Sequence, residues 1–368
     1  MSGNCANKGP VVGHFATIVE MGVLKTFVEY KIFDAIPDEG DISITELADK
    51  VGAHPELLQR LANYLVAAGF LDSPAVGRVV HTDKSRPYKS TEFAGGAVAY
   101  LFDMLFRATA QLPSYFAQNG LASPETASVT PFGMAVNHPD KSLYEILVAE
   151  PKLGQAFDET CSRVGSIFPM KGVHDLGWMQ QEPGALDGTR PLFVDIGGNE
   201  GAALRCVLRD NTFIPAARCA VLDLPRAIEA AEADRARVAA EEDGERLSKV
   251  QLVAGSVYEP LPAPVRGALV YQFRRVLNDF ADADVARAWR SVADAAATDT
   301  RVYIVEKLLE SGRPSEYGAA QDLFMMMFGG KRRSAAMHAE LAAAVGFRLH
   351  KESEDRFNDF GALEFRKA

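Results

Sequence analysis

The stretch that decides the fold reads FVDIGGNEG and runs from Phe193 to Gly201. An apolar run followed by a glycine-rich turn is typical of the first strand and loop of a Rossmann-type sheet, where glycine lets the backbone approach a nucleotide. A second apolar run, Cys219–Leu222, leads to Asp223, 22 residues after Gly201. A carboxylate at that place accepts hydrogen bonds from ribose hydroxyls. The two stretches together predict a parallel sheet that binds a nucleoside.

The rest of the C-terminal half continues the same pattern. Apolar runs follow at Val250–Val253, Ala268–Tyr271 and Val302–Val305, and they alternate with alanine-rich stretches at 226–242, 282–297 and 334–345. Strands that alternate with helices form a doubly wound parallel sheet. A stretch rich in proline and glycine at 177–190 is typical of a linker. We therefore expect an α/β Rossmann-like domain over residues 177–368.

The N-terminal part, residues 1–176, predicts a mostly helical domain. Apolar residues recur at helical spacing from Val11 to Ile36, Ser43 and Glu46 form a capping box, and Pro55 opens a helix that we expect to reach Phe70. A glycine-containing strand pair at 76–85 would complete a winged helix-turn-helix. That motif often reads DNA, but residues 45–72 hold two basic residues against four acidic ones, which disfavours DNA binding.

Composition and charge exclude several classes of protein. The 368 residues carry a net charge of −10 with a pI near 5.3, which argues against nucleic acid or an anionic membrane as partner. The first ten residues are polar, and no apolar run reaches the length expected of a membrane span. The cysteines, Cys5, Cys161, Cys206 and Cys219, and the scattered histidines show no metal-ligand spacing. We expect a soluble cytoplasmic protein without a metal site.

The motifs, in this order along the whole chain, resemble the class I S-adenosylmethionine (SAM) O-methyltransferases of plant and fungal secondary metabolism, such as those that methylate caffeate or sterigmatocystin. The resemblance implies a mostly parallel seven-stranded sheet and an N-terminal winged-helix domain used for dimerisation and for part of the substrate pocket. It further implies a homodimer, a small-molecule substrate, and SAM or S-adenosylhomocysteine as cofactor.

The resemblance also assigns residues to the cofactor. These are Asp195, Gly197, Gly198, Asn199, Gly201, Asp223, Leu224, Gly255, Ser256, Val257, Arg274 and Arg275. Asn199 replaces a glycine, and asparagine tolerates a positive φ better than most residues. Ser256 replaces an aspartate that meets the adenine amino group, so a weaker acceptor stands there. Tyr271 lies near the expected cofactor side, and Asp223 could alternatively cap the helix that begins near Pro225.

The catalytic pattern departs from the family. The family's general base, a histidine before an aspartate, corresponds to Asn278 before Asp279. An amide cannot take a proton in the useful pH range. One carboxylate that steers the histidine corresponds to Arg332, while the other survives as Glu306. With Lys331 added, this set predicts a cavity of hydrogen-bond donors and positive charge that polarises a substrate, although Lys331 and Arg332 could simply be solvated charges at a helix start.

Three functions follow from this pattern. The first is a SAM-binding enzyme that cyclises or dehydrates a polyketide or alkaloid without methylating it, because replacement of the histidine resembles the fungal SAM-dependent pericyclases. The second is an O-methyltransferase whose acceptor hydroxyl is already acidic, so that proximity to the cofactor replaces the base. The third is a non-catalytic SAM sensor or DNA-binding regulator, against which the weakly basic winged helix argues.

Overall fold

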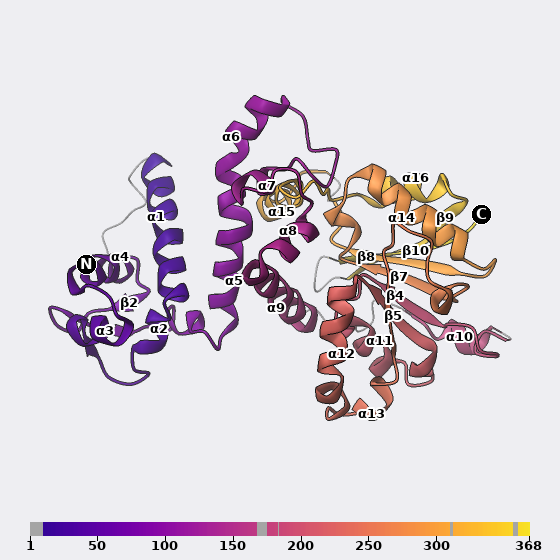
Figure 1. Cartoon of the computed structure of the whole chain (residues 1–368), viewed down its shortest axis with the longest axis horizontal. Helices are drawn as coiled ribbons and strands as arrows, with labels where there is room; N and C mark the ends of the chain where they lie inside the picture. Colours follow the sequence, from indigo (N-terminus) through magenta and orange to yellow (C-terminus); the bar gives the residue numbers. More distant parts are fainter. Residues whose placement is uncertain (1–9, 168–174, 183, 310–311, 356–359) are drawn as a thin grey trace. The chain divides into compact units, whose positions relative to one another are not determined.

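The computed structural model describes residues 10–167, 175–182, 184–309, 312–355 and 360–368 (Figure 1). The chain divides into two compact units, Met1–Ala110 with Glu150–Thr160, and Gln111–Ala149 with Cys161–Ala368. This division differs from the predicted boundary at residue 176, because most of the helical residues between 111 and 176 pack with the second unit. Cys161, Cys206 and Cys219 are free thiols, and Cys5 lies outside the described residues.

Helices of 4 to 20 residues, joined by tight turns, build the first unit. Its helices are α1 (Pro10–Glu29), α2 (Ile32–Ala35), α3 (Ile44–Val51), α4 (Pro55–Ala67) and α5 (Phe93–Leu101). The predicted capping box is confirmed, because the Glu46 N–H donates to Ser43 Oγ at 3.2 Å and the Ser43 N–H donates to Glu46 at 3.1 Å. Helix α4 stops before Phe70, because Gly69 takes a φ of 75° and turns the chain.

The wing of the first unit has three strands where the sequence predicts a pair. Strand β3 (Arg78–His81) lies between β1 (Ile42–Ser43) and β2 (Leu71–Asp72), and both pairings are antiparallel. Of the three, only β3 falls inside the predicted stretch at 76–85. Its two partners are two-residue strands, too short for any alternation of apolar and polar residues to reveal them.

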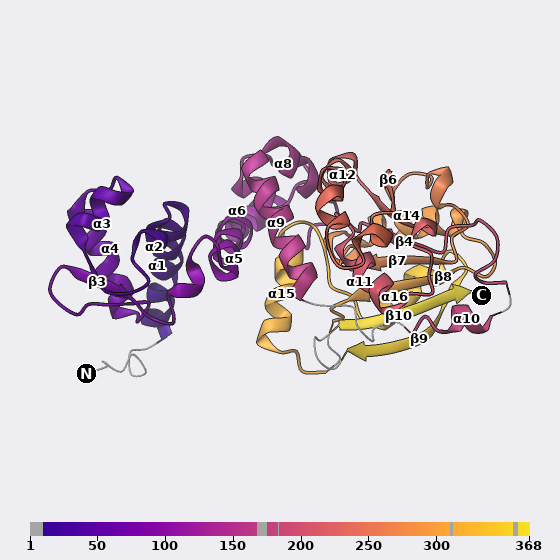
Figure 2. The same cartoon turned by 90° about the horizontal axis from the view of Figure 1, so that it is seen from below.

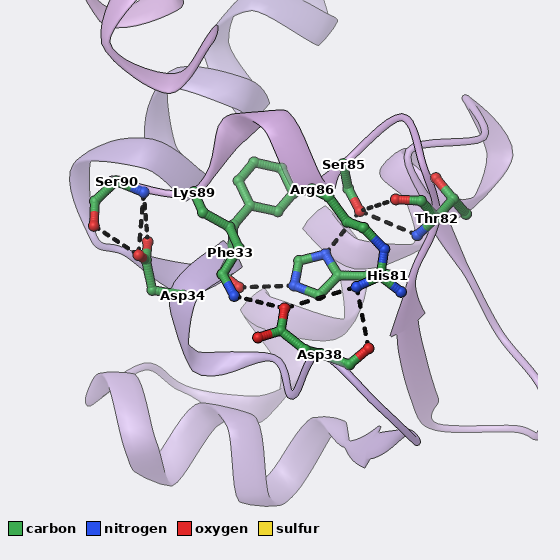
Figure 3. Close-up of polar contacts among 9 residues, drawn as sticks. All are labelled: Phe33, Asp34, Asp38, His81, Thr82, Ser85, Arg86, Lys89 and Ser90. Carbon is green, nitrogen blue, oxygen red and sulfur yellow. Dashed lines mark hydrogen bonds and ion pairs between the residues drawn. The ribbon is translucent and has the colours of Figure 1, made fainter. Parts of the chain in front are cut away.

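A buried histidine joins the wing to the helices of the first unit (Figure 3). One ring nitrogen of His81 lies 2.8 Å from Ser85 Oγ, and the other lies 3.0 Å from the carbonyl oxygen of Phe33. Burial lowers the pKa of His81, and the positive charges of Lys89 and Arg86 lower it further. The ring is therefore neutral in the folded protein at neutral pH.

The second unit is built on a seven-stranded sheet in the order β6-β5-β4-β7-β8-β10-β9. Its strands are β4 (Phe193–Ile196), β5 (Cys219–Asp223), β6 (Gln251–Ala254), β7 (Val270–Arg274), β8 (Arg301–Glu306), β9 (Phe347–Asp355) and β10 (Phe360–Lys367). The first five run parallel, and β10 pairs antiparallel with both β8 and β9 (Figure 2). The predicted mostly parallel sheet is confirmed.

Helices cover both faces of this sheet (Figure 1). The helices of the unit are α7 (Pro131–Ala135), α8 (Leu143–Ala149), α10 (Trp178–Gln181), α11 (Ala202–Asp210), α12 (Pro225–Ala239), α13 (Gly244–Leu247), α14 (Asp282–Ala295), α15 (Glu316–Met326) and α16 (Ala335–Ala343). Successive strand residues point to opposite faces, so Phe193 packs with helices α11 and α12 while Val194 packs with α14 and α16. Helices α6 (Arg107–Asn119) and α9 (Pro151–Ile167) extend across the boundary between the units.

The stretch at 177–190 is not the linker that its composition predicts. It contains α10, and the Met179 side chain is buried in the core. The Arg301 guanidinium lies 3.3 Å from the centre of the Trp178 ring and forms an ion pair with Glu182. The prediction was wrong because these anchors come from β8, which is distant in the sequence.

One described helix stretch, Val11–Glu29, is long and apolar enough to cross a membrane when judged by length and composition alone. This corrects the expectation that no stretch reaches that length. Only 17% of its most apolar window is buried, and the exposed side chains include Val11, Phe15 and Ile18. These two criteria are weak evidence, because helices that pack against another protein meet them as well.

We predict that His81 makes the first unit sensitive to acid. Because its pKa is lower in the folded than in the unfolded state, the unfolded chain binds more protons, so stability falls as the pH drops below the unfolded value near 6.5. His81→Gln should flatten the loss of unfolding free energy between about pH 7.5 and about pH 5.5. His54→Gln, which removes an exposed histidine from the same unit, is the control. Equal slopes for both variants would contradict the prediction.

Candidate cofactor and catalytic site

The loop after β4 is shaped by residues with positive φ. Gly197, Asn199 and Gly201 have φ values of 72°, 50° and 80°. A Cβ at Gly197 would lie 2.6 Å from Val276 Cγ2, and one at Gly201 would lie 2.9 Å from Val221 Cγ2. The glycines let the loop pass close to its neighbours, and Asn199 holds the left-handed conformation that its residue type tolerates.

Asp195 places a buried carboxylate beneath this loop. Its Oδ1 accepts a hydrogen bond from Gln272 at 2.8 Å, whereas its Oδ2 has no partner. A Cβ at Gly198 would lie 2.8 Å from Oδ2, so the loop backbone runs directly past this oxygen. Burial raises the pKa of Asp195 to about 6, against the opposing charge of Arg274. A buried carboxylate oxygen without a donor is suited to a polar group of a ligand.

Asp223 ties the loop to the end of β5. Its carboxylate accepts the N–H of Asn199 and the N–H of Leu224, both at 2.7 Å. Leu224 occupies the N-cap position of α12 without a side-chain cap, so Asp223 is not the helix cap considered from the sequence. An ionised carboxylate accepts several hydrogen bonds, so these two contacts do not prevent Asp223 from accepting ribose hydroxyls.

The ends of β6 and β7 supply the remaining predicted cofactor residues. Gly255 packs where a Cβ would lie 2.9 Å from Leu222, and its N–H donates to the Asp223 carbonyl oxygen at 2.9 Å. Ser256 Oγ accepts the Tyr258 N–H at 3.2 Å, and Val257 packs against the core. Parallel strands β4 to β7 bring all these residues to one edge of the sheet.

Two arginines and a tyrosine were also expected near this edge. Arg274 ends β7, is partly buried, and lies close enough to Asp195 for their charges to interact. Arg275 is exposed and has a φ of 55°. Tyr271 does not belong to the site, because it is fully buried and its hydroxyl donates to the Val265 carbonyl oxygen at 2.6 Å. Residues on one strand alternate between faces, and Tyr271 points into the core.

A tightly held turn, residues 276–280, carries Asn278 and Asp279. Glu306 at the end of β8 accepts the N–H groups of Val276 and Leu277 at 3.0 and 2.7 Å. The Asn278 carbonyl oxygen accepts the Lys331 N–H at 2.8 Å, and a Cβ on Gly330 would collide with that oxygen. The backbone at residue 330 passes so close to the backbone of Asn278 that only glycine fits there.

Arg333 holds the same turn from the other side. It is fully buried and donates to the carbonyl oxygens of Leu277 and Phe280 at 2.8 and 2.7 Å, and to Asp282 at 2.8 Å. Sequence reasoning missed this residue because KRR, from Lys331 to Arg333, looks like a solvated basic run. The nearby Ser334 caps helix α16, and a helix cap at this place was the sequence signal that the basic run is part of the ordered structure.

The catalytic positions contain two buried oxygens without partners. These are Asn278 Oδ1 and Glu306 Oε2. Burial, followed by the charge of Asp279, raises the pKa of Glu306 to about 7. Asp279 accepts a hydrogen bond from the Tyr144 hydroxyl at 2.8 Å, and burial raises its pKa to about 6. Asp279 on the turn and Glu306 beneath it are thus two buried carboxyl groups with raised pKa values.

Tyr144 is a second residue that sequence reasoning missed. It lies on α8, 135 residues before Asp279 in the chain, and it packs beside Phe280. Burial and the neighbouring Asp279 raise its pKa well above the usual value. No sequence signal marks it, since a lone tyrosine on a short helix is normally a core residue.

Lys331 and Arg332 do not form the predicted cavity of positive charge. The Arg332 guanidinium donates to the carbonyl oxygens of Lys307, Gly318 and Leu308 at 3.0, 2.9 and 2.6 Å. Lys331 forms an exposed ion pair with Asp282 at 2.7 Å. Both side chains stabilise loops, so we omit them from the proposed catalytic set. Within the described ranges, no group of three or more His, Cys, Asp or Glu side chains could hold a metal ion.

Known proteins match both parts of the chain. Residues 182–348 match the O-methyltransferase domain, and residues 12–95 match the O-methyltransferase dimerisation domain. Methyltransferase phm5 of Pyrenochaetopsis sp is 40% identical over 95% of this chain and 94% of its own. Methyltransferase fsa4 of a Fusarium species is 37% identical over 96% of this chain and 95% of its own.

Solved structures share the fold. OxaC in complex with sinefungin and meleagrin superposes with a TM-score of 0.85 at 22% identity, covering 98% of this chain and 89% of its own. LepI in complex with S-adenosylhomocysteine and a substrate analogue gives a TM-score of 0.81 at 20% identity, covering 99% and 90%. The relatives and the two domain matches agree. The chain therefore belongs to the fungal SAM-dependent O-methyltransferase family, an enzyme family whose cofactor is S-adenosylmethionine.

Proposed function

We propose that this protein is a SAM-dependent methyltransferase that acts on an acidic hydroxyl or N–H group of a small secondary metabolite. The observation that carries the proposal is Asn278 at the position of the base, in a chain whose relatives at 37–40% identity are named methyltransferases. An amide cannot remove a proton, so the acceptor has to be ionised already. When bound, SAM supplies an electrophilic methyl group.

The cofactor site that we propose is the edge formed by Asp195, the 197–201 loop, Asp223, the 255–257 turn and Arg274. The unpartnered Asp195 Oδ2 and the carboxylate of Asp223, both acceptors at this edge, fit the donor groups of SAM. The close passage of the loop past Asp195, which a side chain at Gly198 would block, fits the backbone approach that the ligand needs. Ser256 and Arg275 lie at the same edge. Ser256 Oγ already accepts the Tyr258 N–H, and Arg275 is exposed, so we leave both out of the proposed cofactor contacts.

In this proposal, Asn278 orients the acceptor group and the buried carboxyl groups fix the turn. A positioned neutral hydrogen bond contributes about 1 to 3 kcal/mol when its loss leaves a buried group unpaired. Holding an ionised acceptor in line with the cofactor supplies the larger part of the rate, because proximity turns a bimolecular step into an intramolecular one. Asp279 and Glu306 act on Asn278 through the turn.

A second candidate is a non-methylating cyclisation or dehydration of a polyketide or alkaloid. The loss of the base favours it, because such a reaction needs hydrogen-bond donors and no proton acceptor of that kind. Arg332 no longer supports it, since its guanidinium is bound to backbone carbonyl oxygens. We therefore place it after methyl transfer, which reverses the order that the sequence suggests.

We also propose that the protein is a cytoplasmic homodimer. The dimerisation-domain match covers residues 12–95, which include the exposed apolar side chains of α1. A second copy would cover them, and isologous dimers are the commonest assembly of soluble proteins. Nucleic acid is not a proposed partner, because the net charge is −10.

Titration calorimetry tests the cofactor site. Asp223→Ala should weaken SAM binding at least tenfold, because it removes an acceptor from the ribose and two hydrogen bonds from the loop. Glu259→Ala, an exposed carboxylate near the same edge, is the control. Equal affinity of the wild type and Asp223→Ala would remove Asp223 from the site.

Product analysis separates the two candidate reactions. With a panel of enols, acidic phenols and N–H acids, the wild type should form S-adenosylhomocysteine in a one-to-one ratio with methylated product. Asn278→Ala should slow turnover on the order of 10- to 100-fold. Asn278→His should extend methylation to less acidic phenols, because it restores a base. Substrate conversion with SAM present but without S-adenosylhomocysteine would instead support the non-methylating reaction.

Sedimentation velocity tests the dimer. Phe15→Glu together with Ile18→Glu should convert the dimer to monomer, because it places charges on the exposed apolar side of α1. A single Val76→Glu, which places a charge on an exposed apolar residue outside α1, should leave the dimer intact. A wild type that stays monomeric at micromolar concentration would contradict the proposal.

A further inference from the structure

Arg275, the residue just before the turn 276–280, has a backbone conformation that arginine rarely adopts. Its φ is 55°, in the left-handed region where glycine and asparagine are the usual residues. Two hydrogen bonds fix this conformation, because the Arg275 N–H donates to the Val305 carbonyl oxygen at 3.0 Å and the N–H of Val276 donates to Glu306 at 3.0 Å. A strained residue that its surroundings hold in place is a candidate for a functional role.

The charge of Arg275 has no partner in the protein. Four other cations near the turn interact with carbonyl oxygens or carboxylates, and they are Arg274, Lys331, Arg332 and Arg333. The Arg275 side chain is exposed, and its guanidinium makes no hydrogen bond or ion pair with any residue that the structure describes. A guanidinium stays charged at every pH at which proteins are studied, so Arg275 is suited to bind an anion from solution.

Arg275 lies where the glycine-rich loop meets the turn that carries Asn278. A Cβ on Gly197 would lie 2.6 Å from Cγ2 of Val276, so the loop touches the residue next to Arg275. Asn278 follows Arg275 by three positions in the chain. Parallel strands bind ligands at their carboxyl ends, and Arg275 directly follows the end of β7. A molecule bound between the loop and Asn278 would therefore lie within reach of this side chain.

The two neighbouring arginines act on different groups of this edge. The charge of Arg274 interacts with Asp195, beneath the glycine-rich loop. The charge of Arg275 instead acts on the turn, because burial raises the pKa of Asp279 while the Tyr144 hydrogen bond and Arg275 oppose this rise. Arg275 thus belongs to the side of the edge that holds the acceptor in the proposed reaction.

We propose that Arg275 is the anion-binding residue of the acceptor site, and that the substrate is a small planar organic anion whose charge is shared by two atoms, such as an enolate. This inference rests on the proposed function, in which the acceptor is already ionised. An anion that leaves water needs a countercharge, and the planar guanidinium offers donors that match a flat anion. Arg275 can bind one of the two charged atoms, which leaves the other for the methyl group.

Titration calorimetry on the full-length protein with S-adenosylhomocysteine bound tests this inference. The probes are ionised enols, phenols and N–H acids, each paired with its uncharged methylated derivative. Arg275→Ala should weaken binding of the anions about tenfold or more and change binding of the neutral derivatives by less than about twofold, because only the anions lose a charged hydrogen bond. Arg275→Lys should lose less, since it keeps the charge. Arg290→Ala, which removes an exposed arginine from α14, is the matched control and should change neither.

The carboxylate of the cofactor is the other anion that Arg275 could bind, so the affinity for S-adenosylhomocysteine is measured for every variant and should stay at the wild-type value. Weaker cofactor binding by Arg275→Ala, with unchanged binding of the anions, would assign Arg275 to the cofactor and overturn the proposal. Equal losses for anions and neutral derivatives would overturn it too, as would a wild type that does not prefer the anions.

Arg275→Gly decides the matter if the alanine variant does not fold, because glycine adopts the left-handed conformation without strain. It should bind the anions as weakly as Arg275→Ala. These measurements need no turnover. A wild type that forms no S-adenosylhomocysteine from SAM would therefore refute the proposed methyl transfer, whereas only the binding data decide the role of Arg275.

Discussion

The buried hydrogen bonds that hold the turn 276–280 are the constraint on which the site depends. Glu306 accepts two N–H groups of this turn and Arg333 donates to two of its carbonyl oxygens, so opposite charges grip it from two sides. A buried charged group is tolerable only when its polar atoms find partners. The Arg333 guanidinium donates to two carbonyl oxygens and to Asp282, and Glu306 Oε1 accepts two N–H groups. The turn is therefore fixed even though the base that it carries in the family is absent.

This rigidity explains how the turn can carry Asn278, where the resemblance places a histidine, and keep its shape. The backbone contacts of Asn278 run through its carbonyl oxygen, Lys331 and Gly330, and none of them uses its side chain. A substitution of Asn278 therefore changes the functional group on the turn and leaves the backbone conformation of the turn in place. The proposed cofactor edge is held separately, because Asp223 fastens the glycine-rich loop to the end of β5. In the proposed site, acceptor chemistry and cofactor binding can thus change independently.

Some residues of this site could be predicted from the sequence, and others could not. Asp195, Gly197 and Gly201 lie where the pattern places them, because a glycine-rich turn after a buried strand has few alternative structures. Arg332 was assigned to substrate polarisation and instead binds carbonyl oxygens of distant loops. Tyr144 and Arg333 were missed, because their partners are brought close only by the packing of elements far apart in the chain.

The sequence by itself determined the doubly wound sheet and the order of its motifs, since these depend on local periodicity and on residue type. Only the tertiary structure decided which charges are buried, which oxygens lack partners, and that residues 177–182 are anchored to β8. The physical reason is that a pKa or a hydrogen bond depends on neighbours in space. Those neighbours come from strands and helices whose separation along the chain carries no local signal.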